Sequence, residues 1–468
     1  MDPTTNRISL CSGGGSEQFI LEMDTSSTAN PTGDMNAISL DHDSDGNIYL
    51  VGNSYAEVSG QQVSTVCKVN KTGTSVEWSK YFDYSGHTES FKCSRVNRNE
   101  TGEPLYVSGH SGNGVTYTTG SYKDAQLYKF TSSGTTTWRT AWGGGGADDW
   151  NGFDFDSSNN VYLTGQNYPW QSGIALVKKD SSGASQWHIK KDNNTTESSN
   201  HVVVDSSGNP WWAGTIHNPG DGWVGKYTSA GARTSSWTMS YSQDLLYAMD
   251  IDASDNVYIM IDNNSSWSSI SGYSGTIMQY NNSSSTWSWA MVSGGTGNNY
   301  GYGVCCDKSV ANGDVYGYHH AANGQFNSQT NGGVYICKRS YAGSHQWSRL
   351  FYKTTGYTSF DSQGPSIRCD GEFVYLCGSF QVTGQSNYRP FVIKYPVDGS
   401  ITGTFGEWKI EELTPGSNGY YAYDNNYISS WSIGNGYESN TSTNGSDQTV
   451  QSTEYSGNMI TGNKEILS

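Results

Sequence analysis

The sequence has few basic residues and no long apolar run. Lys and Arg together number 26, against 43 Asp and Glu, so the formal net charge is −17. A protein that binds a phosphate backbone needs a basic patch, so this balance argues against nucleic acid as a partner. No apolar stretch reaches the ~18 residues of a membrane-spanning helix, and we therefore expect no membrane insertion.

The N-terminus also lacks the features of a secretory signal. Residues 1–15, MDPTTNRISLCSGGG, contain no basic n-region and no apolar h-region. The eight cysteines lie mostly inside predicted strands, which is typical of free thiols in a reducing compartment. We expect a protein made in a bacterial cytoplasm and not exported by the main secretory route. A disulfide between Cys369 and Cys377 is the alternative for one pair of thiols.

Common catalytic motifs are missing as well. There is no G-x-S-x-G elbow and no glycine-rich loop between a strand and a helix. The nine histidines are scattered, and the adjacent pair His319–His320 has no Cys or carboxylate at metal-ligand spacing. The sequence assigns no catalytic residue, and we expect a protein that is not an enzyme.

One short phrase is present seven times. Its type copy is DSSNNVYLTG at 156–165, a Ser/Asn turn followed by a strand. The aromatic residue of the phrase recurs at intervals of 47 to 59 residues, at Tyr49, Tyr106, Tyr162, Trp211, Tyr258, Tyr316 and Tyr375. Such a period indicates an array of similar supersecondary units.

A second phrase alternates with the first. It consists of a Lys-bearing strand, a Gly or Ser turn and a Trp, as in VKKDSSGASQW at 177–187. Connections of two to four residues force neighbouring strands to be antiparallel. Each unit is therefore predicted to be a four-stranded antiparallel meander of about 50 residues.

A single meander cannot bury both of its faces, but stacked meanders that close into a ring can. The sequence thus predicts an all-β fold, a β-propeller of four-stranded antiparallel blades. We predict eight blades, because the segment 423–432 around Tyr427 resembles the first phrase and the N-terminal strand at 18–24 would share its blade; seven blades is the alternative. The predicted domains are a polar arm at 1–16, the propeller at 17–433 and a polar tail at 434–468.

All long connections are expected on one face of the propeller, because strand direction alternates. They are rich in Tyr, Trp, Asn, Gly and Ser, the composition of recognition loops. We predict exposed platforms there that stack on a sugar ring or pack on a partner protein, although each aromatic could instead fill a gap between blades. The candidates are Trp150, Trp170, Trp223, Trp267, Tyr300 and Tyr388, with Asp148, Asp149 and Asn167 beside them.

One turn could bind a metal ion. In DHDSDGNI, Asp41, Asp43 and Asp45 precede Gly46 in the order of a D-x-D-x-D-G calcium loop. The twelfth position is Gly52 rather than Glu, so an EF-hand is excluded. Calcium is therefore the one possible cofactor, and a hairpin turn stabilised by Asp side chains is the alternative.

The D-x-x-GN-x-Y-x-x-G phrase, followed by a Lys strand, a turn and a Trp, resembles the bacterial β-propeller repeat family over about residues 36–432. This resemblance implies the propeller fold in cell-surface, extracellular or viral structural proteins, mostly without enzymatic activity. Turns such as DSSGASQW also resemble the Asp-box of sialidases. No spacing among the nine arginines singles out the three that such an enzyme needs.

The polar ends are similar to the arms of tailed-phage virion proteins, which thread onto neighbouring subunits. We therefore predict a non-enzymatic virion structural or attachment protein, assembled in the host cytoplasm as part of a larger assembly. Its aromatic loop face would bind a host surface glycan or another virion protein. The alternative is a carbohydrate-binding, lectin-like propeller on the bacterial surface or outside the cell, and a polysaccharide-degrading enzyme is the third possibility.

Overall fold

A computed structural model describes most of the chain from residue 17 to residue 467. Within that span it does not describe residues 26–34, 56–61, 84–87, 113–122, 144–146, 168–172, 192–196, 217–220, 241–243, 265–269, 271, 296, 322–325, 327–331, 385–387, 418, 424–431, 436–445, 449–452 and 457–458. The described residues form an all-β structure. They include no helix long and apolar enough to cross a membrane.

The described strands include seven four-stranded antiparallel sheets, which we call units 1 to 7 in chain order. Unit 1 is β2 (Met35–His42), β3 (Ile48–Tyr55), β4 (Gln62–Val69) and β5 (Val76–Asp83). Unit 2 is β6 (Glu89–Val96), β7 (Leu105–Gly112), β8 (Lys123–Phe130) and β9 (Thr136–Gly143). Unit 3 is β10 (Asp149–Phe155), β11 (Val161–Asn167), β12 (Gly173–Lys179) and β13 (Ser185–Lys191). Unit 4 is β14 (Glu197–Val204), β15 (Pro210–Ile216), β16 (Asp221–Tyr227) and β17 (Arg233–Ser240).

The remaining units follow the same order. Unit 5 is β18 (Asp244–Ile251), β19 (Val257–Asn264), β20 (Tyr273–Asn281) and β21 (Thr286–Gly295). Unit 6 is β22 (Asn299–Cys306), β23 (Val315–Ala321), β24 (Gly333–Arg339) and β25 (His345–Lys353). Unit 7 combines β26 (Tyr357–Cys369), β27 (Phe373–Val382) and β28 (Tyr388–Pro396) with the N-terminal strand β1 (Phe19–Thr25), which pairs with β28.

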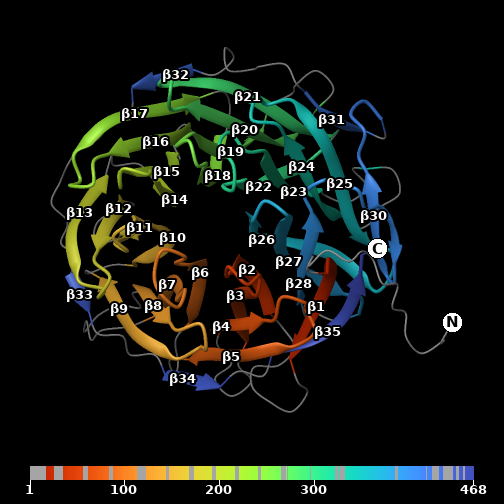
Figure 1. Ribbon diagram of the computed structural model, residues 1–468, viewed down its shortest axis with the longest axis horizontal. Coiled ribbons are helices and arrows are strands. Elements are labelled where there is room, and N and C mark those ends of the chain that lie inside the picture. Colours follow the sequence, from red (N-terminus) through yellow and green to blue (C-terminus); the bar gives the residue numbers. More distant parts are fainter. Residues whose placement is uncertain are drawn as a thin grey trace.

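The seven units are arranged around a common centre (Figure 1), with the first strand of each unit innermost. A hydrophobic cluster lies between each unit and the next. The cluster between units 7 and 1 contains Phe19, Leu21, Leu40 and Tyr375, so packing continues past the point where the chain begins. Strand direction places the short turns on one side, the turn face, and the longer connections on the other, the loop face.

The described strands do not include a separate eighth sheet. Tyr427, its predicted anchor, lies outside the described residues. On either side of it, β31 (Tyr420–Ala422) and β32 (Ser432–Asn435) do not form a sheet of their own but pair with the outer strands of units 5 and 4. The N-terminal strand does share a sheet with C-terminal strands, but it does so in unit 7.

The first phrase folds into a turn held by its aspartate. In unit 3, Asp156 Oδ1 accepts the backbone N–H of Asn160 at 2.9 Å, and Asp156 Oδ2 accepts the Tyr162 hydroxyl at 3.3 Å. The second phrase supplies Lys178, whose Nζ lies 3.6 Å from Asp156 and 4.9 Å from the centre of the Tyr162 ring. The two phrases that alternate in the sequence are thus one polar cluster in space.

The tryptophan of the second phrase links each unit to the next. Trp187 of unit 3 donates its Nε1–H to the carbonyl of Ser229 in the 3–4 turn of unit 4 at 3.1 Å, and Lys178 donates to the same oxygen at 3.3 Å. The indole covers Gly231, whose φ of 87° favours glycine. Trp78, Trp289 and Trp347 make the same bond to the following unit.

Buried carboxylates make a second type of link on the inner strands. Asp41, Asp154 and Asp250 each accept a backbone N–H from the inner strand of the next unit, at 2.8, 2.9 and 3.0 Å. Each bond satisfies a carboxylate and an amide that would otherwise be buried without a partner. These bonds fix the relative height of units 1 and 2, 3 and 4, and 5 and 6.

The described strands of residues 403–466, which we call the belt, lie around the outside of the ring, and they pair with the units in the reverse of the unit order (Figure 1). β30 (Trp408–Glu412), with β29 (Gly403–Phe405) beside it, pairs with β25 of unit 6. Then β31 and β32 pair with units 5 and 4, β33 (Ser446–Gln448) with β9 of unit 2, and β34 (Thr453–Ser456) with β5 of unit 1. Finally β35 (Met459–Ile466) pairs with β1 in unit 7.

The belt includes described strands on both sides of the predicted domain boundary at 433/434. The described strands of the segment predicted as a polar tail bond to the ring of their own chain, because an outer strand has one row of unpaired N–H and C=O groups. The belt also contributes apolar side chains. Trp408 is 1% exposed, with its ring centre 5.3 Å from that of Phe391 and its Nε1–H donating to Glu22 at 2.9 Å. The predicted arm at 1–16 lies outside the described residues.

The seven cysteines that the structure describes are free, and six of them are buried. Cys369 and Cys377 do not face each other, because they pair in register with Val374 and Ser366. Burial raises the pKa of both thiols to about 12. Thiols of this kind react slowly while the protein is folded.

We expect the belt to set the stability of the ring. A chain ending at Thr402 should aggregate and unfold at a lower temperature, because it exposes the outer edges of six units. Trp408→Ala, a point change at the start of the belt, should cost about 3–5 kcal/mol of unfolding free energy. Denaturant unfolding and size-exclusion chromatography measure both effects. A Trp408→Ala protein as stable as wild type, together with a truncated chain that stays monomeric and unfolds at the wild-type temperature, would contradict this role.

Candidate functional site

A cavity lies on the axis of the ring. Its volume is about 850 Å³, and all seven inner strands contribute to its lining. The lining residues from these strands are Asn36, Ile38, Ser39, Ser90, Lys92, Cys93, Arg95, Asn151, Gly152, Phe153, His201, Tyr247, Ala248, Met249, Tyr302, Gly303, Val304, Ser366, Ile367 and Arg368. Gln62, Lys123 and Tyr388, each the first residue of its strand on the loop face, also line it. The cavity therefore extends to the loop face.

The inner strands point side chains into this cavity by means of β-bulges. In β10, Trp150 pairs with Gly165 and Gly152 with Thr164, so Asn151 is an extra residue. The extra residues at the same place in five units are Ile38, Lys92, Asn151, Tyr247 and Tyr302, and all five line the cavity. Bulges of this kind re-aim side chains next to functional sites.

The glycine that ends the first phrase makes room for the bulge. A Cβ atom on Gly165 would lie 1.7 Å from the carbonyl oxygen of Asp149 on the inner strand, and one on Gly52 would lie 2.1 Å from that of Asn36. Any larger residue at these positions would push the inner strand away. The last residue of the repeated phrase is thus a sequence signal for the bulge, one that the sequence analysis did not use.

The cavity has two chemically different walls. Tyr247 and Tyr302 stand on neighbouring inner strands with ring centres 5.1 Å apart and planes at 83°, and Tyr300 lies 5.8 Å from Tyr302. Units 1 to 3 supply amides and hydroxyls instead, from Asn36, Asn53, Ser90 and Asn151, together with the cations of Lys92 and Lys123. An aromatic wall facing a hydrogen-bonding wall is typical of a pocket for a ligand with both apolar and polar faces.

The charge of the cavity is opposite to that of the protein. Four lining residues are Lys or Arg and none is Asp or Glu, although the chain carries a net charge of −17. The nearest carboxylates stand behind the lining. Asp154 lies 3.9 Å from Arg95, and Asp41 lies 4.0 Å from Arg368. No ion pair among the described residues engages Lys92 or Lys123.

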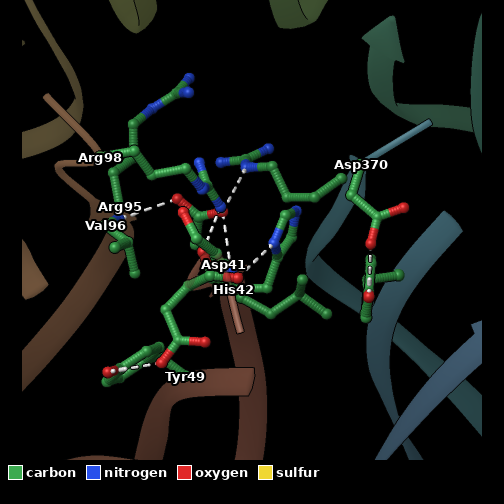
Figure 2. Close-up of polar contacts among 12 residues, drawn as sticks. Asp41, His42, Tyr49, Arg95, Val96, Arg98 and Asp370 are labelled. Carbon is green, nitrogen blue, oxygen red and sulfur yellow. Dashed lines mark hydrogen bonds and ion pairs between the residues drawn. The ribbon is translucent and has the colours of Figure 1, made fainter. Parts of the chain in front are cut away.

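Asp41 anchors the end of the cavity at the turn face (Figure 2). Its Oδ1 accepts a bond from Arg98 Nη2 at 2.8 Å, and its Oδ2 accepts the Val96 N–H at 2.8 Å. Burial opposes ionisation of this carboxyl, but Arg98 and Arg368 outweigh it and hold the pKa of Asp41 well below its usual value. Asp41 is therefore a permanent negative charge that holds these arginines in place.

His201 lines the cavity as a neutral group. Burial, together with the charges of Arg95 and Arg368, lowers the pKa of His201 to about 3. At neutral pH its imidazole can therefore donate one hydrogen bond and accept another without adding charge.

His110 and Asp149 form a pair beside the cavity near the loop face. His110 Nδ1 lies 2.9 Å from Asp149 Oδ2, and the His110 side chain lines the cavity. Burial opposes ionisation of Asp149, but His110, Lys92 and Lys123 outweigh it, so the pKa of Asp149 lies below its usual value. Asp149 is ionised at neutral pH and holds the imidazole from behind.

The predicted platforms Trp150 and Trp223 are not exposed. Each is 1% accessible, because each lies inside a strand and not in a loop. The Trp150 ring packs 6.3 Å from that of Trp142, and the Trp223 ring 5.0 Å from that of Trp212. Asp148, also predicted as a ligand contact, is likewise buried at 1% accessibility.

Other predicted residues do lie at the cavity. Tyr388 lines it, Tyr300 packs against Tyr302, and Asp149 stands behind His110. Trp170 and Trp267 lie outside the described residues. Asn167 ends β11, but its side chain is not described. The site predicted from the sequence did not include Lys92, Tyr247 and Tyr302, because residues inside the inner strands were expected to be buried in the core.

The three carboxylates predicted to hold calcium do not converge. Asp41 faces Arg98, Asp43 bonds to Asn47 and lies 3.3 Å from Lys68, and Asp45 is exposed. In the part of the chain that the structure describes, no group of three or more His, Cys, Asp or Glu could hold a metal ion. The turn at 43–47 instead has the Asp–Asn geometry of the alternative that the sequence left open.

The buried carboxyl of Asp124, next to the cavity-lining Lys123, gives a test of the electrostatics around the axial cavity. Asp124 is 7% exposed, its Oδ2 has no hydrogen-bond partner among the described residues, and burial raises its pKa to about 6. A raised pKa favours the folded state below the unfolded value of ~3.9, and this contribution is lost as pH rises through about 6.

Asp124→Asn, which mimics the protonated acid, should therefore raise the Tm at pH 7.5 by roughly 2–5 °C and leave it unchanged at pH 4. Thermal unfolding followed by circular dichroism at the two pH values measures the difference. Equal shifts at both pH values would show that Asp124 is not protonated in the folded protein below pH 6. Asp45→Asn, at an exposed turn position, serves as the control for removing a carboxylate.

No family model and no curated protein matches the chain. Similar solved structures include the phage phi92 endosialidase, with a TM-score of 0.45 and 11% identity over 88% of this chain and 76% of that one. Polysaccharide lyase Uly1 has a TM-score of 0.44 and 6% identity over 82% of this chain and 98% of its own. The NanB sialidase from Streptococcus pneumoniae has a TM-score of 0.41 and 10% identity over 82% and 71%.

These likenesses correct one expectation. An endosialidase, a polysaccharide lyase and a sialidase are enzymes, so the expectation that this protein is not an enzyme is withdrawn. At these TM-scores and identities the three structures assign no substrate or residue to this chain.

Proposed function

We propose that this protein is a closed seven-bladed β-propeller that binds a glycan in its axial cavity. The observation that carries the proposal is the convergence of bulge residues from the inner strands on one cavity with an aromatic wall and a hydrogen-bonding wall. A sugar has ring faces of C–H groups that pack on Tyr and edges of hydroxyls that bond to amides, so its two chemistries match the two walls.

The volume of the cavity supports a ligand of several sugar rings at most. At about 850 Å³ it falls in the range of pockets that enclose small ligands, ≈300–1,000 Å³. A flat protein partner would meet the loop face as a whole instead. The alternative function, docking of a neighbouring protein on that face, would not require the inner-strand tyrosines.

Two settings fit the proposal. One is a tailed-phage virion, on which the loop face would meet the host surface, and the other is a bacterial cell surface. The belt removes one argument for the virion, because the described part of the C-terminal segment is bound to its own ring and is not a free arm. Neighbouring genes for capsid, portal or tail proteins would support the virion.

We expect the purified chain to bind members of a glycan array, and Tyr302→Ala and Tyr247→Ala each to weaken that binding at least tenfold. Tyr302→Phe, which keeps the ring, should stay within about threefold of wild type, since stacking supplies most of the contact. Isothermal titration calorimetry with the best array ligand measures the change. Tyr341→Ala, on the turn face, is the matched control.

Circular dichroism would first establish that each variant is folded. If no glycan binds, or if binding survives both Tyr247→Ala and Tyr302→Ala, the axial cavity is not a glycan site. Loss of binding in Tyr341→Ala alone would likewise contradict the proposal.

A further inference from the structure

The sector of the cavity between units 2 and 3 carries an excess of positive charge. Lys92 is the bulge residue of β6, Lys123 begins β8 at the loop face, and both line the cavity with His110 of β7. The one carboxylate recorded close to all three is Asp149, whose ionisation they favour together. Two ammonium groups and an imidazole thus face a single carboxylate.

His110 also has a buried ring nitrogen without a hydrogen-bond partner in the described part of the chain. The side chain is 5% exposed, its Nδ1 side is occupied by Asp149, and its Nε2 has no hydrogen-bond partner among the described residues. A buried polar atom without a partner costs free energy unless something bonds to it. His110 lines the cavity, so its ring is the group of this sector that would have to turn for Nε2 to reach a ligand there.

We infer, resting on the proposed function, that the glycan is acidic and that its carboxylate binds between Lys92, Lys123 and His110. The two lysines supply charge without a fixed fork geometry, and Nε2 supplies a directional contact to the carboxylate or to a hydroxyl beside it. The ring of the same sugar, or of the next, packs on the wall formed by Tyr247 and Tyr302. In a chain of net charge −17, attraction of an acidic polymer requires such a local reversal of sign.

The deeper cations play a different part. Arg95 and Arg368 stand 3.9 and 4.0 Å from Asp154 and Asp41, which balance them from behind. Lys92 and Lys123 favour the ionisation of Asp149 together with His110, and neither lysine makes an ion pair within the described part of the chain. The carboxylate of the ligand is therefore expected at the loop-face end of the cavity and not at its floor.

The test compares sugars that differ only in charge. Oligogalacturonate and oligosialic acid are titrated into the full chain by calorimetry, each next to its carboxyl-reduced form, with a sulfated oligosaccharide as a third arm. We expect at least one acidic glycan to bind at least tenfold more tightly than its carboxyl-reduced form. Raising NaCl from 50 to 500 mM should remove most of that difference, because salt screens the charges.

The variants locate the contact. Lys92→Gln combined with Lys123→Gln should weaken binding of the acidic glycan at least tenfold and leave the carboxyl-reduced form within about twofold. Lys71→Gln, which removes an exposed lysine on the turn face, is the control for a loss of positive charge away from the cavity and should change neither. His110→Gln should weaken the acidic glycan less than the double variant.

Each outcome separates this inference from the proposed function. If a neutral glycan binds as tightly as its acidic form and still requires Tyr302, the cavity binds glycans but the carboxylate site is wrong. Preference for the sulfated arm alone would overturn the carboxylate as the ligand group. If the double variant loses acidic and neutral forms equally, the lysines do not select charge. If no glycan binds at all, both proposals fail.

Discussion

The structure depends on a contact found at four of the boundaries between units, in which the tryptophan of a fourth strand lies on the following turn. A four-stranded sheet of this composition has two faces to bury and few Leu or Ile to bury them with. Trp187 and its equivalents provide area and a directional bond together, since the indole covers a turn glycine while its N–H reaches a carbonyl of the next unit. The lysine beside it bonds to the same carbonyl and to the aspartate of its own unit. Each turn is therefore held from both sides.

This outer contact leaves the inner strands free for another purpose. Because the units are joined by their outer strands and by carboxylate bonds such as Asp154 to Val204, each inner strand can carry a bulge without loosening the ring. The bulge places a side chain on the axis that belongs to neither face of its sheet. Residues at these positions differ from unit to unit, as Lys92, Asn151 and Tyr302 show, while the turn residues repeat. The turn residues are therefore similar from unit to unit, whereas the bulge residues on the axis differ.

The sequence predicted the units well because their signals are local. Asp156, Asn160 and Tyr162 form their turn within seven residues, and the period exposes the repetition. The candidate site was harder to predict. A bulge breaks the alternation of a strand, so Trp150 and Phe153 both pack in the core although they are three residues apart. The sequence prediction placed Trp150 and Trp223 in loops and expected them to be exposed, whereas both lie in strands. The segment after residue 433 was predicted to be a polar tail because edge pairing uses the backbone, and Ser, Thr and Asn side chains give no sequence pattern for it.

The belt ends on β1, the first strand of the described chain, and the Leu467 N–H donates to the carbonyl of Gln18 at 3.2 Å. β1 lies between β28 and β35, so both of its hydrogen-bonded neighbours come from the last sixth of the sequence. During synthesis both edges of β1 stay unpaired until β28 has been made, and one edge stays unpaired until β35 has been made. Pairing over such sequence separations is slow, because the entropy cost of closing a long loop comes before the stabilising contacts form. Of the described strands, the one that is synthesised first is thus fixed among the last.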